Sequence, residues 1–171
     1  MTNYIEDAEL AEIIHGHQPD VVMATAITPM IYKSQETLRI VKAVCPTAIT
    51  IMGGIHPTYM YQEVLGEAPW IDYIIRGEGE EISVNLLRAI ANGTDKRDRH
   101  EILGIAFLED GQVVATAAHP PIKNLDTLVA DWSLLEWEKY TGLTHCPRKT
   151  QCLDDFWGRG APPKIVQLRK S

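Results

Sequence analysis

Three short apolar segments, each followed by a break and then by a helical pattern, constrain the fold of this chain most. They cover residues 21–27, 48–52 and 71–75. The first two are continuous runs of small and apolar side chains, which is typical of strands that helices cover on both faces. Neighbouring parallel strands need a crossover of about a dozen residues, which a helix supplies. The repeated pattern therefore predicts an α/β domain with a parallel sheet.

Helical patterns surround these segments. Residues 7–17 carry apolar side chains at helical spacing ahead of the first strand. A second helix is expected to be capped by Ser34 and to stop at Pro46. A short helix is predicted over residues 59–65, and a longer one follows Gly79. Helices thus alternate with the strands, as the α/β class requires.

A hairpin is expected after the last of these helices. Residues 102–108 and 113–117 flank an Asp-Gly pair at 110–111, which is a strong signal for a tight turn between antiparallel strands. We expect this β-hairpin to be an appendage of the parallel sheet. Tryptophan and leucine side chains in residues 126–140 indicate a connecting segment that packs against another part of a protein.

Charge and cysteine content exclude several classes of protein. The chain has 16 Lys and Arg against 23 Asp and Glu, and its net charge of −7 disfavours binding to nucleic acid. No apolar run reaches the roughly 20 residues that span a bilayer, and the first residues are acidic where a signal peptide is basic. Cys45, Cys146 and Cys152 fit neither a disulfide framework nor a usual metal-site spacing. We therefore expect a cytoplasmic protein with free thiols.

The loops after the three strands are where a ligand is expected, because open parallel sheets bind ligands at the carboxyl ends of their strands. The first loop offers small residues and hydroxyl groups, and paired glycines in the second remove side chains from the path of a ligand. The third loop is acidic and lacks the glycine spacing of a dinucleotide site. The same residues also have explanations that need no ligand. The first loop can be a packed strand end, the paired glycines can form a sharp turn, and His56 can make a local hydrogen bond.

Taken together, the three loops resemble the cobalamin-binding domain of B12-dependent radical S-adenosylmethionine enzymes. The resemblance rests on the order and spacing of the loops and on Asp72-Tyr73 ahead of the third loop. Within that group, the oxidative cyclases that form the isocyclic ring in bacteriochlorophyll synthesis are the most similar branch. The segments that carry the resemblance are residues 25–29, 53–56, 68–72, 76–80 and 131–132, within about residues 1–140.

This resemblance implies a truncated flavodoxin-like, or Rossmann-like, sheet that holds cobalamin at its strand ends. In such enzymes the sheet faces a barrel that carries a [4Fe-4S] cluster and uses S-adenosylmethionine. No axial histidine is assigned to the cobalt, because the Asp-x-His-x-x-Gly motif is absent, and no catalytic residue or protein metal site is expected. The cobalamin contacts that the resemblance implies are Thr25, Ala26, Thr28, Gly53, Gly54, His56, Gly77, Glu78 and Gly79.

The sequence departs from this family at both ends. We expect a partial cobalamin-binding domain over residues 1–125, because the strands that open the family's domain have no counterpart here. Residues 126–140 then form a linker toward an absent barrel, and residues 141–171 form a divergent basic tail. The Cys-x-x-x-Cys-x-x-Cys motif of the cluster is missing. The chain is therefore expected to be a fragment without cyclase activity of its own.

Expectations about binding partners follow from the same departures. Cobalamin binding is expected to be weak and base-off, and a radical S-adenosylmethionine barrel on another chain would supply the missing chemistry. Without the first strands, residues 21–27 would lie at an open sheet edge and lead to self-association. The alternative is a stand-alone α/β module that binds a small ligand or a protein partner without redox chemistry.

Overall fold

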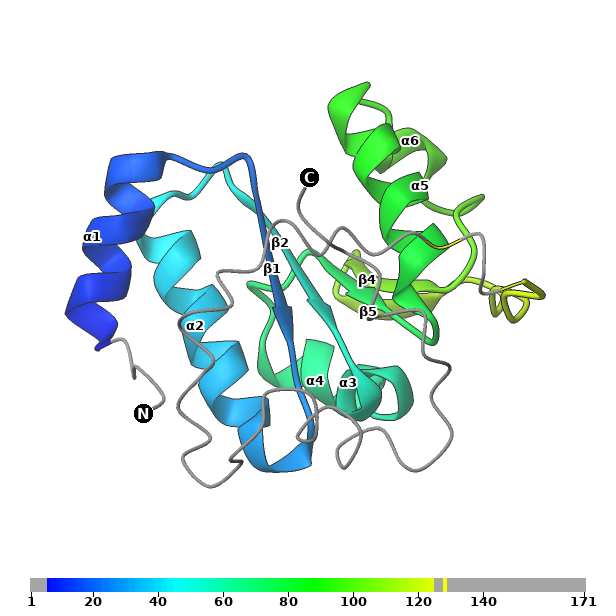
Figure 1. The fold of residues 1–171 in the computed structure, drawn as a ribbon, viewed down its shortest axis with the longest axis horizontal. Coiled ribbons are helices and arrows are strands. Elements are labelled where there is room, and N and C mark those ends of the chain that lie inside the picture. The colour runs from blue at the N-terminus through cyan, green and yellow to red at the C-terminus, as the bar shows by residue number, and fades with distance from the viewer. Residues whose placement is uncertain (1–5, 125–127, 129–171) are drawn as a thin grey trace, which may run out of the picture. The chain divides into compact units, whose positions relative to one another are not determined.

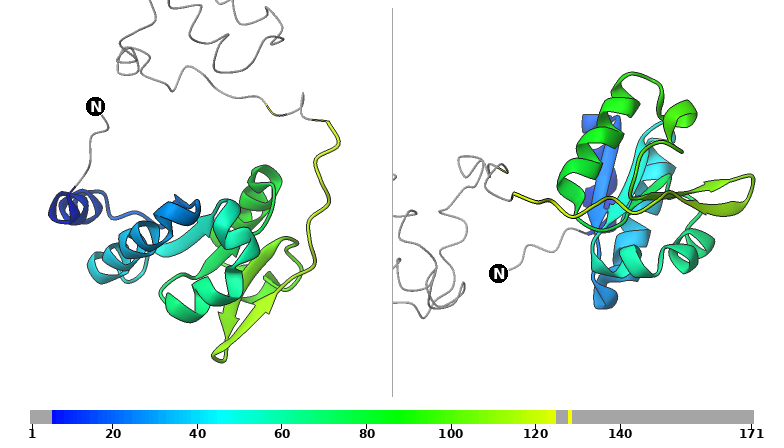
Figure 2. Two further views of the ribbon diagram at one scale, coloured as in Figure 1. Left: turned by 90° about the horizontal axis from the view of Figure 1, so that it is seen from below. Right: turned by 90° about the vertical axis from the view of Figure 1, so that its right-hand side faces the viewer.

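Helices and strands alternate along the chain as far as the third strand in the computed structural model (Figures 1 and 2). The structure describes residues 6–124 and 128. In chain order the elements are α1 (Asp7–His17), β1 (Val21–Thr25), the 3-10 helix η1 (Thr28–Met30), α2 (Ile31–Val44), β2 (Ile49–Gly53), α3 (Ile55–Tyr59), α4 (Tyr61–Glu67), β3 (Tyr73–Ile75), α5 (Gly79–Ala91), α6 (Asp95–Asp98), β4 (Ile105–Glu109) and β5 (Gln112–Ala115).

Five strands form one mixed sheet in the order β1-β2-β3-β4-β5. β1, β2 and β3 are parallel, and their register pairs Val21 with Ile49 and Ile51 with Tyr73. β4 runs antiparallel to β3, and β5 runs antiparallel to β4. The expected α/β class, with parallel strands followed by an antiparallel hairpin, is confirmed.

The hairpin of β4 and β5 is part of the main sheet. It turns at Asp110 and Gly111, whose φ angles of 49° and 77° suit a two-residue turn. Ile105, Ala106 and Phe107 of β4 are fully buried, so the hairpin that extends the parallel strands also supplies core residues. An alternating apolar pattern identifies such strands, but it does not identify the sheet edge that they join.

Helices cover the sheet in two layers. α2 and α4 pack on one face, where Leu38 and Leu65 belong to the same buried cluster as Met52. α5 packs on the opposite face, where Ile82 and Leu86 are buried (Figure 1). α1 packs against α2.

Only one face of β1 is well covered, although its apolar run predicts helices over both faces. Val22 and Ala24 are partly buried against the layer of α2. Met23 alternates with them, faces the side of α5 and is 48% exposed, whereas Val21 at the start of the strand packs against the cluster that contains the α5 residues. The expectation of a doubly covered strand is therefore wrong for β1: an apolar run shows what a strand can pack against, not which helices are present.

α2 begins earlier than the sequence predicts, and α3, which was not predicted, precedes the expected short helix, which is α4. α2 begins at Ile31, and Ser34 is buried in its first turn, where its hydroxyl donates to the Thr25 carbonyl oxygen at 3.1 Å instead of capping the helix. α3 begins at Ile55, so His56 is helical and does not lie in a loop. Both helices therefore start at the carboxyl ends of the strands that precede them.

Part of the predicted organisation lies outside the described residues. Of the expected linker at residues 126–140 only Leu128 is described, and the expected tail at residues 141–171 is not. Among the described helices, none has the length and apolar content needed to cross a membrane.

Candidate functional site

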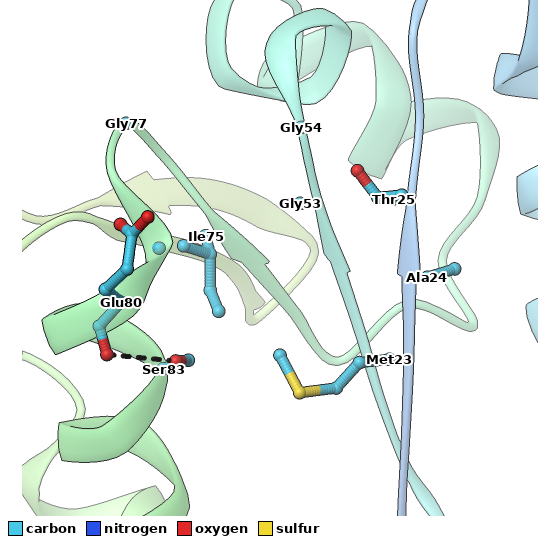
Figure 3. Close-up of a pocket in the computed structure, with 10 residues that line it drawn as sticks. Met23, Ala24, Thr25, Gly53, Gly54, Ile75, Gly77, Glu80 and Ser83 are labelled. Carbon is cyan, nitrogen blue, oxygen red and sulfur yellow. Dashed lines mark hydrogen bonds between the residues drawn. The ribbon is translucent and has the colours of Figure 1, made fainter. Parts of the chain in front are cut away.

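A pocket of about 550 Å³ lies at the carboxyl ends of the three parallel strands, on the side of α5 (Figure 3). β1 and β2 form one wall, and the loop after β3 with the start of α5 forms the other. The lining consists mostly of small side chains, and Glu80 is the one charged residue among the described residues that line it. The lining residues are Met23, Ala24, Thr25, Gly53, Gly54, Ile75, Gly77, Gly79, Glu80 and Ser83.

Gly54 allows the end of β1 to approach the start of α3. Its φ angle is 103°, and a Cβ atom there would lie 2.6 Å from the Ala26 carbonyl oxygen and 2.7 Å from Thr25 Oγ1. The His56 N–H donates to the same Ala26 oxygen at 3.3 Å. A side chain at Gly54 would therefore collide with backbone atoms that these hydrogen bonds hold in place.

Gly53 has a different role from its neighbour. A Cβ atom on Gly53 would meet only Ile75 Cβ, at 3.9 Å, which is an ordinary van der Waals distance. Gly53 is the last residue of β2 and lies between Thr25 and Ile75 in Figure 3. The protein fold would accept a side chain at Gly53, so the absence of one serves mainly to keep the pocket open.

Side-chain hydrogen bonds join the three strand-end loops. His56 Nδ1 lies 3.1 Å from Thr28 Oγ1, which links the first loop to the second. The Thr58 hydroxyl donates to the Gly54 carbonyl oxygen at 2.8 Å and accepts from the Gly77 N–H at 3.1 Å, which links the second loop to the third. The loops thus form one connected rim around the pocket.

The structure divides the nine predicted contacts into two groups. Glu78 is directed elsewhere than the pocket lining, since its Oε2 accepts the Ile122 N–H at 2.8 Å. Ala26 is buried behind the strand end. The residues that line the pocket are Thr25, Gly53, Gly54, Gly77 and Gly79, and those outside the lining are Ala26, Thr28, His56 and Glu78.

Sequence reasoning missed the other five described lining residues: Met23, Ala24, Ile75, Glu80 and Ser83. The period of two in a strand places Met23 on the same face as Thr25, so this residue could have been found. Glu80 and Ser83 are three residues apart on one side of α5, where the Ser83 hydroxyl donates to the Glu80 carbonyl oxygen at 3.3 Å. Recognising those two required the position of α5.

The chemistry of the lining favours a bulky ligand with hydrogen-bond donors. The hydroxyl groups of Thr25 and Ser83 and the carboxylate of Glu80 can accept hydrogen bonds, and the described lining residues include no Lys, Arg or His. A di- or triphosphate would find a carboxylate there and no cationic side chain. Within the described part of the chain, no group of three His, Cys, Asp or Glu side chains could hold a metal ion.

Comparisons with known proteins point to one family. The model of the B12 binding domain matches residues 2–87. The anaerobic magnesium-protoporphyrin IX monomethyl ester cyclase of Rubrivivax gelatinosus is 47% identical over 163 residues, which is 95% of this chain and 29% of the relative. The cyclase of the same name from Cereibacter sphaeroides is 46% identical over 140 residues, or 82% of this chain and 23% of the relative. The chain thus spans less than a third of the length of these curated relatives.

Solved structures share the fold. The radical S-adenosylmethionine methyltransferase TsrM from Kitasatospora setae, with cobalamin and a [4Fe-4S] cluster bound, matches with a TM-score of 0.58 at 21% identity, over 69% of this chain and 22% of its own. The cobalamin-dependent radical enzyme OxsB, with aqua-cobalamin and S-adenosylmethionine bound, matches with a TM-score of 0.57 at 18% identity, over 68% of this chain and 16% of its own.

Proposed function

The chain belongs to the B12-binding domain family, and on that premise we propose that it binds cobalamin at the carboxyl ends of β1, β2 and β3. The observation that carries the proposal is the pocket at these strand ends, which Gly53 leaves open and to which the part of the chain that the structure describes contributes no cationic side chain. Cobalamin is bulky, and its corrin ring bears amide groups that donate hydrogen bonds. The hydroxyl groups of Thr25 and Ser83 and the carboxylate of Glu80 are suited to accept them.

The nine residues implied by the family resemblance have different parts in this proposal. Thr25, Gly53, Gly54, Gly77 and Gly79 surround the ligand, since all five line the pocket. Thr28 and His56 hold the rim through their mutual contact at 3.1 Å, and Ala26 anchors the second loop through its carbonyl oxygen. Glu78 is outside the lining and accepts the Ile122 N–H through Oε2, so its proposed part is to hold the third loop in place.

When bound, cobalamin brings its own cobalt centre, which supplies redox and group-transfer chemistry without a metal site built from protein side chains. The residues of this chain bind and orient the group. We propose weak, base-off binding without a protein ligand to cobalt. His56 Nδ1 is in contact with Thr28, and the sequence has no Asp-x-His-x-x-Gly motif, both of which support this proposal.

We further propose that the chain acts as the cobalamin-binding region of an oxidative cyclase that forms the isocyclic ring in bacteriochlorophyll synthesis. The identity of 47% and 46% to two such cyclases supports this assignment. The reaction then depends on a barrel with a [4Fe-4S] cluster and S-adenosylmethionine, supplied by further polypeptide. The proposed protein partners are that barrel and, through the open edge of β1, another chain.

A titration of the purified full chain with hydroxocobalamin, followed by its visible absorption spectrum, tests the proposed site. We expect saturable binding that Gly53→Val weakens by about tenfold or more. The branched side chain would occupy space in the pocket without colliding with the rest of the protein. Overpacking of this kind costs about 1–3 kcal/mol. Gly66→Val is the matched control, since a Cβ atom at Gly66 meets nothing within 4 Å and Gly66 lies in α4, outside the pocket lining.

Two results would contradict the proposal. One is a folded chain that does not change the cobalamin spectrum at any concentration, which would favour the stand-alone module without redox chemistry. The other is binding that Gly53→Val and Gly66→Val affect equally, since the ligand would then lie away from the strand-end pocket.

A further inference from the structure

The hydroxyl group of Thr58 connects the two walls of the pocket, although Thr58 is not one of the described lining residues. It donates to the Gly54 carbonyl oxygen at 2.8 Å and accepts from the Gly77 N–H at 3.1 Å. Gly54 belongs to one wall and Gly77 to the other, and both lie at the upper end of the view in Figure 3. One side-chain oxygen therefore bridges the walls at this end.

The Thr58 end of the bridge is firmly held. Thr58 lies in α3, and its backbone N–H also donates to the Gly54 carbonyl oxygen, at 3.2 Å. The start of α3 is fixed to the end of β1, because the His56 N–H donates to the Ala26 carbonyl oxygen at 3.3 Å. A hydroxyl group has one hydrogen and two lone pairs, so the bond to Gly54 leaves the oxygen free to accept from Gly77.

The Gly77 end of the bridge has little other support on the pocket side. Gly77 is exposed, and a Cβ atom there would meet nothing within 4 Å, so side-chain packing does not fix its position. The side chains of Arg76 and Glu78 hydrogen-bond to the segment after β5. Arg76 also stacks 4.4 Å from the ring centre of Tyr61, which packs on the α2 side of the sheet. These contacts hold the third loop from directions other than the second loop.

We propose that Thr58 is a positioning residue, whose hydroxyl group fixes the third loop against the second and so sets the width of the pocket at this end. A ligand that contacts both walls then meets a preformed site. Without the bridge, the ligand would have to order the third loop, and the entropy lost in ordering a loop reduces affinity. The effect on affinity rests on the proposed function, whereas the effect on the third loop exists in the free protein.

Hydrogen exchange of the Gly77 amide in the ligand-free full chain, resolved by NMR, tests the bridge. Valine has nearly the shape of threonine but no hydroxyl group, so Thr58→Val removes the acceptor and leaves the packing in place. We expect the Gly77 amide to exchange about fivefold faster or more in this variant, and near the wild-type rate in Thr58→Ser, which keeps the hydroxyl group. Thr58→Ala provides a second variant without the hydroxyl group.

Thr94→Val is the matched control for the loss of a threonine hydroxyl group. The Thr94 hydroxyl lies 3.5 Å from the Ala89 carbonyl oxygen, outside the pocket lining, so its removal should leave the Gly77 amide unchanged. Titration of the same variants with hydroxocobalamin gives the second readout, after circular dichroism has established that each is folded. We expect Thr58→Val to raise the Kd about fivefold, and Thr58→Ser and Thr94→Val to keep the wild-type value.

Three results would overturn the proposal. One is a Gly77 amide that exchanges at the wild-type rate in Thr58→Val and in Thr58→Ala. Another is an equal loss of cobalamin affinity in Thr58→Val and Thr58→Ser, since the hydroxyl group would then not be responsible. The third is an unchanged Kd in a folded Thr58→Val. A wild-type chain that does not bind cobalamin would contradict the proposed function instead, and the Gly77 exchange rates would still decide the role of Thr58.

Discussion

At the residue scale, two adjacent glycines at the junction of β2 and α3 serve different purposes. The fold requires glycine at position 54, because a Cβ atom there would lie 2.6 and 2.9 Å from backbone atoms of Ala26. Gly53 keeps the pocket open, because the fold itself would accept a Cβ atom there at an ordinary van der Waals distance. The pair of glycines was evident from the sequence, but the different role of each one was not. It depends on the approach of α3 to the end of β1, which no local pattern reports.

This difference predicts that Gly54→Ala destabilises the fold more than Gly77→Ala. Both positions have φ angles near 100°, so both variants bear the strain of a left-handed region, about 1–3 kcal/mol. A Cβ atom at Gly77 meets nothing within 4 Å, whereas one at Gly54 collides with Ala26, which adds a steric cost. Urea unfolding of both variants measures the difference. Equal losses in the free energy of unfolding would show that the collision is relieved by movement of the loop.

At the element scale, β3 and α6 are joined by a buried hydrogen bond. The Tyr73 hydroxyl donates to Asp95 Oδ2 at 2.7 Å, and Tyr73 also packs edge-on against Phe107 with ring centroids 6.1 Å apart. Burial and the hydrogen bond to Asp95 raise the pKa of the Tyr73 hydroxyl above its ordinary value. α6 was not predicted, because its four residues are too few to show a helical period.

The bond predicts a loss of stability in Tyr73→Phe of about 1–3 kcal/mol at neutral pH, since the Asp95 carboxylate then loses a donor in a buried position. The pKa of the Tyr73 hydroxyl is higher in the folded state than in the unfolded chain, where it is about 10. The contribution of this hydroxyl to stability is therefore complete below pH 10 and declines as the pH rises further. Chemical unfolding between pH 7 and 11 should therefore show the wild type approaching the variant. Tyr59→Phe, at a side chain that is 74% exposed, is the neutral control.

Other elements were predictable to different degrees. α1 was predicted with its observed bounds, because its apolar residues follow one helical stripe up to the break at Pro19. The Asp110-Gly111 turn was predictable for a similar reason, as that pair favours positive φ angles. The starts of α2 and α3 were not, since Ser34 is held by the end of β1 and Gly54 is followed by a helix without a separate loop.

At the scale of the whole molecule, the α/β class and the location of the site at the strand ends followed from the order of apolar runs and glycines. The exposure of Met23 did not follow, because it depends on how much of the α5 side of β1 is covered. The same geometry that leaves Met23 exposed also places it in the pocket lining. The candidate ligand site therefore includes the exposed part of β1.

Hydrogen exchange of the full chain with and without cobalamin tests the central claim most directly, because it locates the ligand without a variant. The account predicts slower exchange of backbone amides in residues 23–28, 53–56 and 77–83, which form the strand ends and the start of α5. Amides of the distant β4–β5 turn at Asp110 should not change. Protection confined to that hairpin, or no protection at the strand ends in a chain that binds cobalamin, would contradict it.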